Sequence, residues 1–195
     1  MKLRPATLFR HLLPALAGAV IFTVAGHAAE PTAFDLFKEG NRYVGEEAKN
    51  RLIEIRSDKS IGSTTPAIWT IVYFDPSSSG KGTEVKFAAG QKTAIKHWGN
   101  FLGVAKTPYE IPKDKLKVDS DQALRTALAE PLLKNLTMKA TQMTLEEWEG
   151  LVVWKVRLWA TKLMKTDEMA EVGQVFIDVA DGKVLKSDLK IKKVD

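Results

Sequence analysis

Two stretches, WTIVYF at residues 69–74 and WKVRLW at residues 154–159, decide the predicted fold. Each begins with tryptophan and is rich in the β-branched and aromatic residues that favour strands. When the two tryptophans are aligned, Ile71 matches Val156, and side-chain alternation places the matched apolar residues on the same strand face. The pattern therefore predicts an internal repeat, with one such strand at the centre of each half.

Helices and further strands are expected around these two stretches. Residues 33–50 have helical composition that Gly40 weakens or splits, and a second helix is expected at 119–130 behind an Asp or Ser cap. Residues 98–112 are rich in Gly and Pro, which is typical of a linker. The expected strands are 51–56, 67–74, 83–88, 91–97, 136–145, 151–160, 171–179 and 183–191.

The first 28 residues have the pattern of a bacterial secretory signal peptide. Basic residues precede an uncharged run at 12–25, and small residues follow at 26–29. The run is too short to span a bilayer comfortably, and the chain has no cysteine to carry a lipid. We therefore expect a periplasmic or secreted protein with no membrane anchor after signal cleavage.

The charge balance gives little reason to expect nucleic-acid binding. The chain has 29 basic and 24 acidic residues, and three of the basic ones lie in the first 28 positions. The remainder is therefore nearly neutral, unlike the basic surfaces that bind nucleic acids.

Part of the second half, from about 116 to 189, resembles a PepSY domain. The resemblance is carried by DSDQALRTA at 119–127, WKV at 154–156 and VFIDVADGKV at 175–184. The first half is a more degenerate version that keeps Trp69 and lacks the Asp-Gly hairpin. The resemblance implies a cystatin-like fold and a non-catalytic, extracytoplasmic role, for which regulation or inhibition of proteases is the general proposal.

The expected fold class is therefore α+β, with two tandem cystatin-like modules. Each module would pack one helix on a curled antiparallel sheet. The expected domain boundaries are a signal peptide at 1–28, a first module with its linker at 29–108, and a second module at 109–195.

Residues that carry chemistry are sparse, and we expect neither an enzyme nor a cofactor or metal site. His97 is the single histidine beyond the signal, and without cysteine it cannot form an ordinary zinc site. Asp178 and Asp181 fit a hairpin turn better than a calcium loop. The carboxylates at 146, 147 and 149 are expected to be solvated rather than paired for acid–base catalysis.

Four residues are candidates for binding a protein or peptide partner. Phe74 and Trp159 each follow a tryptophan by five positions and so lie on the opposite strand face, which Lys155 and Arg157 share. Each aromatic is either covered by the other half or exposed as an anchor. Binding would use this sheet face or an unpaired strand edge. The alternatives are a small-ligand carrier, with its ligand between helix and sheet, and, ranked lowest, a carboxylate-based hydrolase.

Overall fold

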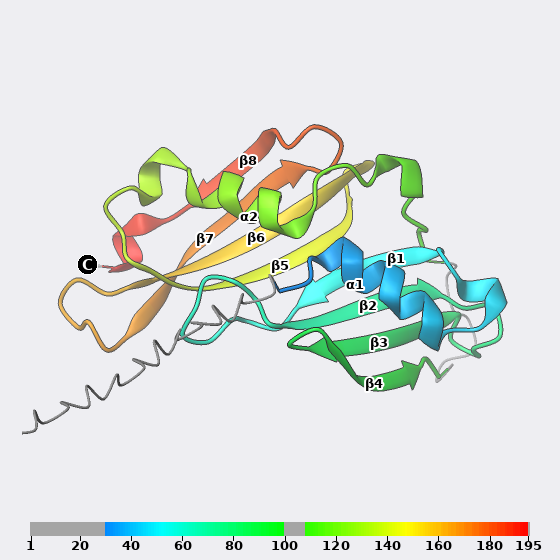
Figure 1. The fold of residues 1–195 in the computed structure, drawn as a ribbon. Helices are drawn as coiled ribbons and strands as arrows, with labels where there is room; N and C mark the ends of the chain where they lie inside the picture. Colours follow the sequence, from blue (N-terminus) through cyan, green and yellow to red (C-terminus); the bar gives the residue numbers. More distant parts are fainter. Residues whose placement is uncertain (1–29, 100–107, 195) are drawn as a thin grey trace, which may run out of the picture.

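The computed structural model describes residues 30–99 and 108–194, so the expected signal peptide at 1–28 lies outside the described residues. Eight antiparallel strands form one sheet, and two short helices lie on one of its faces (Figure 1). The bounds are α1 Ala33–Gly40, β1 Leu52–Ser57, β2 Ile68–Phe74, β3 Gly82–Ala88, β4 Gln91–His97, α2 Ser120–Leu128, β5 Met138–Trp148, β6 Leu151–Thr161, β7 Met169–Asp178 and β8 Val184–Leu189.

The prediction of two tandem cystatin-like modules is wrong. The strand order is β4-β3-β2-β1-β5-β6-β7-β8, so β1 and β5 join the two groups of strands into one continuous sheet. Ile55 of β1 lies opposite Leu145 of β5, and both side chains are fully buried. Separate modules would leave these apolar side chains at sheet edges, and pairing removes them from water.

The expected strands are present, but their lengths and the first helix differ from expectation. β5 and β6 form a longer hairpin than expected, because its turn is confined to residues 149 and 150. α1 ends at Gly40, and two short 3₁₀ turns follow, Asn41–Tyr43 and Glu46–Ala48. Part of the expected linker, residues 100–107, lies outside the described residues.

The first turns of the two helices hold each other in place. Thr32 and Asp35 form a capping box at the start of α1. Asp119, the N-cap of α2, also accepts the backbone N–H of Phe34 at 3.1 Å, and Ser120 Oγ accepts the N–H of Ala33 at 3.0 Å. Side chains at the start of α2 therefore satisfy free N–H groups of α1, which ties both helices to one place over the sheet.

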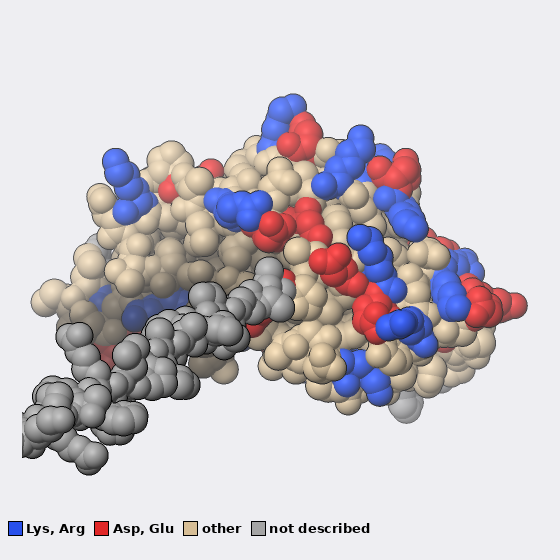
Figure 2. All heavy atoms as spheres, viewed as in Figure 1, with Lys and Arg blue, Asp and Glu red and all other residues tan. Residues whose placement is uncertain are grey.

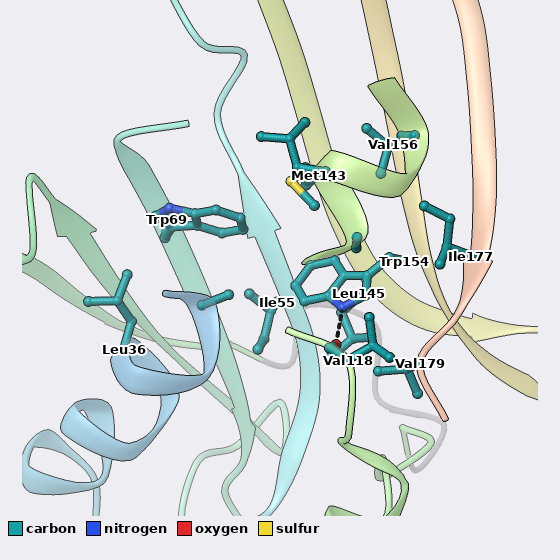
Figure 3. Close-up of a cluster of buried hydrophobic side chains, with 14 of the residues drawn as sticks. Leu36, Ile55, Trp69, Val118, Met143, Leu145, Trp154, Val156, Ile177 and Val179 are labelled. Atoms are coloured by element: carbon teal, nitrogen blue, oxygen red, sulfur yellow. Dashed lines mark hydrogen bonds between the residues drawn. The ribbon is translucent and has the colours of Figure 1, made fainter. Parts of the chain in front are cut away.

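One apolar core runs between the helices and the sheet. Its centre contains Trp69 of β2 and Trp154 of β6, whose rings meet edge to face at 6.3 Å (Figure 3). Trp154 is fully buried, and its Nε1 donates to the backbone oxygen of Val118 at 2.8 Å. The strands of both groups thus share one core.

Candidate binding surface on the open sheet face

The sheet face opposite the helices, called the open face from here on, has no further layer in the part of the chain that the structure describes. Tyr73 and Trp154 lie on the covered face. The hydroxyl of Tyr73 donates to the backbone of α1, and Nε1 of Trp154 donates to the backbone of the segment before α2. Side chains alternate along a strand, so Val72 and Val153 lie on the open face. Both valines are nevertheless fully buried.

An ion-pair network covers the part of the open face formed by β1, β2 and β3. Val72 lies between Glu54 and Glu84 on the neighbouring strands. Arg56 bonds to both carboxylates, at 2.6 Å to Glu54 and 2.9 Å to Glu84. Glu84 also accepts the Nε1 hydrogen of Trp98 at 2.9 Å. The bridging guanidinium explains how a valine on an open face is kept from water.

Two groups of this network, Arg56 and Glu84, have pKa values that are shifted in favour of their charged forms. Burial opposes the charged form of both Arg56 and Glu84. For Arg56, hydrogen bonds and charge attraction from Glu84 and Glu54 outweigh burial, so its pKa is raised. For Glu84, hydrogen bonds from Trp98 and Arg56, with the charge of Arg56, outweigh burial, so its pKa is lowered. A hollow of about 250 Å³ lies beside them, lined by Arg56, Asp58, Thr70, Glu84, Lys86, Ala94 and Lys96.

Three of the four predicted partner-binding residues come together on the open face. Lys155 pairs with Glu146 at 2.5 Å, and Arg157 pairs with Glu171 at 2.7 Å. Trp159 follows them on β6, but it is only 8% exposed, because Lys59 lies over its ring at 4.3 Å. Of the two readings that its sequence position allowed, Trp159 matches the covered one.

Phe74 does not join this group. It is also 8% exposed and lies under the guanidinium of Arg51 at 4.1 Å. Its backbone N–H donates to Arg51 at the start of β1, whereas Trp159 lies opposite Ala140 near the start of β5. Because β1 and β5 are antiparallel, these positions are at opposite ends of the open face.

Sequence reasoning missed a second aromatic cluster on the same face. Trp148 and Phe176 pack with ring centroids 4.7 Å apart, and Lys186 Nζ lies 5.7 Å and 5.9 Å from the two rings. Phe176 lies opposite Lys155 in the sheet. The sequence did hold a signal for Phe176: it directly precedes Ile177, which is buried, so side-chain alternation places Phe176 on the opposite face, the face of Lys155.

The carboxylates considered for chemistry serve local structure. Asp178 and Asp181 accept backbone N–H groups within their own turn, as the hairpin reading predicts. Glu146 pairs with Lys155, and Glu147 accepts the N–H of Gly150. Within the described ranges, no three His, Cys, Asp or Glu side chains group so that they could hold a metal ion, and no helix is long and apolar enough to cross a membrane.

His97 belongs to a small polar cluster at the end of β4. Thr83 Oγ1 donates to Asp75 at 2.5 Å and lies 2.8 Å from His97 Nδ1. Since a hydroxyl has one hydrogen, Nδ1 must donate to Thr83. A catalytic histidine would instead accept the hydroxyl proton, and Thr83 is fully buried. The cluster therefore fastens β4 to the turn after β2.

Asp75 should make stability depend on pH. Burial opposes its ionisation, but hydrogen bonds from Ser77 and Thr83, with the nearby His97, hold the pKa of its carboxyl below the ordinary value. The stabilisation is therefore complete above the unfolded pKa, about 3.9, and is lost as pH falls through the lower folded pKa. We expect Asp75→Asn to flatten the loss of stability below about pH 4.

The measurement is urea unfolding of both proteins from about pH 6 to about pH 2. The pKa values of Glu84 and Glu110 are also lowered, so the difference between the two profiles isolates Asp75. Parallel profiles would show that Asp75 does not contribute this pH dependence.

No family model matches this chain, and no curated protein matches it. A solved structure with a similar fold is that of a "putative lipoprotein" from Clostridium difficile 630. The two structures superimpose with a TM-score of 0.53 at 16% sequence identity, covering 80% of this chain and 91% of the other. At this identity the likeness is one of fold alone.

Proposed function

We propose that this protein is a non-catalytic, extracytoplasmic binding module that recognises a protein or peptide partner through the open face. The observation that carries the proposal is the set of charges held by ion pairs, with the half-buried ring of Trp148 under Lys186, on a face that no described element covers. Arg and aromatic residues supply most of the binding energy in many protein interfaces. Here both kinds are held in place before a partner arrives, which lowers the entropy cost of binding.

The location is proposed from two kinds of support. The first 28 residues have the signal-peptide pattern, and the similar solved structure is described as a "putative lipoprotein". Since the chain has no cysteine for a lipid, we propose a periplasmic or secreted protein. The resemblance to PepSY sequences further suggests that the partner is a protein under regulation, such as a protease.

The alternative of a small-ligand carrier has less support. It requires room between helix and sheet, where the hollow lined by Trp69, Leu124 and Met143 measures only about 60 Å³. Pockets for small molecules usually measure about 300–1,000 Å³. The hydrolase alternative also has less support, because Glu146 and Glu147, two of the three carboxylates it could use, are engaged with Lys155 and a turn.

The test is affinity capture from periplasmic extract, followed by titration of the purified partner. The wild-type chain would be compared with the double variant Lys155→Ala, Arg157→Ala. Both side chains are partly exposed and surface ion pairs contribute about 0–1 kcal/mol, so the variant is expected to fold. Arg42→Ala removes an exposed ion-paired arginine beside α1 and serves as the control.

We expect one partner to bind the wild type and Arg42→Ala and to bind the double variant at least about tenfold more weakly. Equal binding by all three would place the site elsewhere. Failure to recover a partner, together with sustained hydrolysis of a substrate by the purified chain, would contradict the proposal as a whole.

A further inference from the structure

Strand β4 is an edge strand with an unusual degree of exposure. All seven residues of Gln91–His97 are exposed, including Ile95 at 41%. β3 pairs with one side of β4, and no strand among residues 30–99 and 108–194 pairs with the other. An unpaired edge presents free backbone N–H and C=O groups that can bind another extended chain.

The backbone groups that point outward can be identified from the ladder. Trp98 donates its N–H to the backbone oxygen of Gly82 on β3. In an antiparallel ladder, alternate residues face the same neighbour, so Lys96 also bonds to β3. The N–H and C=O of Ile95 and His97 therefore point away from the sheet.

The outer edge of β4 is basic. It carries Lys92 and Lys96 and no acidic residue, and neither lysine forms an ion pair with a described residue. An extra residue in β4, around Thr93, shifts the register against β3. Lys92 consequently lies towards Tyr43, 5.5 Å from its ring, whereas Lys96 lines the hollow on the open face. One cation thus stands on each side of the edge.

We propose that the outer edge of β4 binds an extended acidic segment of a partner protein as an additional antiparallel strand. The proposal rests on the proposed binding function, adds a contact at the edge of the sheet to the open face, and names the chemistry of the partner. On β3, the residues opposite Lys96 and Lys92 are Glu84 and Phe87, three positions apart. A regular strand on the outer side has the same spacing, so the segment carries Asp or Glu at positions i and i+3, one on each face.

A second copy of this chain fits the edge poorly. Two-fold pairing of β4 with itself would bring four lysines and no acidic residue to one seam, and edge lysines oppose such pairing. The edge strand at the other end of the sheet, β8, carries both Lys186 and Asp188, so its charges favour neither an acidic nor a basic segment. Lysines on β4 therefore oppose self-pairing and favour an acidic partner.

The probe is a capped octapeptide, Thr-Val-Glu-Val-Thr-Glu-Val-Thr, added to the isotope-labelled chain and followed by backbone amide NMR. We expect shifts and slower amide exchange at residues 91–97. The analogue with Gln at both Glu positions is expected to bind about fivefold more weakly, as loss of two exposed charge pairs implies. Lys96→Glu should weaken binding of the acidic peptide and leave binding of the Gln analogue unchanged.

Ile95→Pro tests the backbone pairing directly. Proline removes the outward N–H at a position where an edge strand tolerates it, and Ile95→Thr keeps that N–H as the matched control. We expect Ile95→Pro to abolish peptide binding and Ile95→Thr to retain it, with both variants folded by circular dichroism. If Ile95→Pro does not fold, the effect of Lys96→Glu on binding of the acidic peptide still tests the proposal.

Equal binding of the acidic peptide and its Gln analogue, or shifts elsewhere than β4, would overturn the proposal. Self-association of the chain that Ile95→Pro abolishes would assign the edge to a second copy instead. The capture experiment with the Lys155, Arg157 double variant is independent of β4. If the double variant loses a captured partner and the acidic peptide does not bind β4, the proposed binding function stands and the proposal of an acidic strand at β4 is wrong.

Discussion

Replacement of Trp154 with alanine is expected to lower the free energy of unfolding by about 3–5 kcal/mol. The indole is fully buried, stacks on Phe34 of α1 at 6.1 Å and meets Trp69 of β2 at 6.3 Å. Alanine would leave a large void at the point where α1 and both groups of strands meet. It would also leave the Val118 oxygen without the Nε1 donor. A loss of this size is a large part of the total stability of a typical domain.

The measurement is urea unfolding followed by circular dichroism, with Trp154→Phe as the control. Phenylalanine fills much of the void but cannot donate to Val118, so we expect a smaller loss, about 1–3 kcal/mol. Wild type and both variants should unfold in one transition, because Trp154 of the second strand group packs against Trp69 of the first and Phe34 of α1. Two separate transitions in the wild type would show that the strand groups behave as independent domains.

The sequence predicted local structure well, because local structure depends on neighbouring residues. The runs 67–74 and 151–160 are rich in the β-branched and aromatic residues that favour strands, and Asp119 does begin α2 as its N-cap. Gly40 was correctly expected to interrupt the first helix. The structure also shows why this position is glycine: a Cβ there would lie 2.1 Å from the hydroxyl oxygen of Tyr73, which donates to the backbone oxygen of Phe37 in α1.

The pairing of β1 with β5 could not be predicted in the same way. Ile55 and Leu145 are ninety positions apart, and their alternation patterns fit an outer strand of a small sheet as well as a central strand of a large one. The candidate site shows the same limit. Lys155, Arg157 and Trp159 follow from one strand pattern, but Lys59, which covers Trp159, belongs to a distant loop. Its contact depends on the tertiary fold alone.

Gly173→Ala is expected to destabilise the protein by about 2–4 kcal/mol, the second large effect. Gly173 has a φ of 123°, which side chains rarely allow. An added Cβ would also lie only 2.0 Å from the backbone oxygen of Asp188 on β8. The register shift between β6 and β7 lies beside this residue, so the glycine permits an irregularity that keeps both β6 and β8 paired with β7.

Gly150→Ala is the matched control, because Gly150 has a φ of 83° and no atom within 4 Å of an added Cβ. Its expected cost is that of backbone strain alone, about 1 kcal/mol. The extra loss of unfolding free energy in Gly173→Ala, relative to Gly150→Ala, then measures the clash with β8. Equal losses in the two variants would show that the clash is relieved without cost. Because β8 is an edge strand, the clash can also be relieved by separating β8 from β7. Hydrogen exchange should therefore accelerate at Val184–Leu189 in Gly173→Ala, and remain unchanged there in Gly150→Ala.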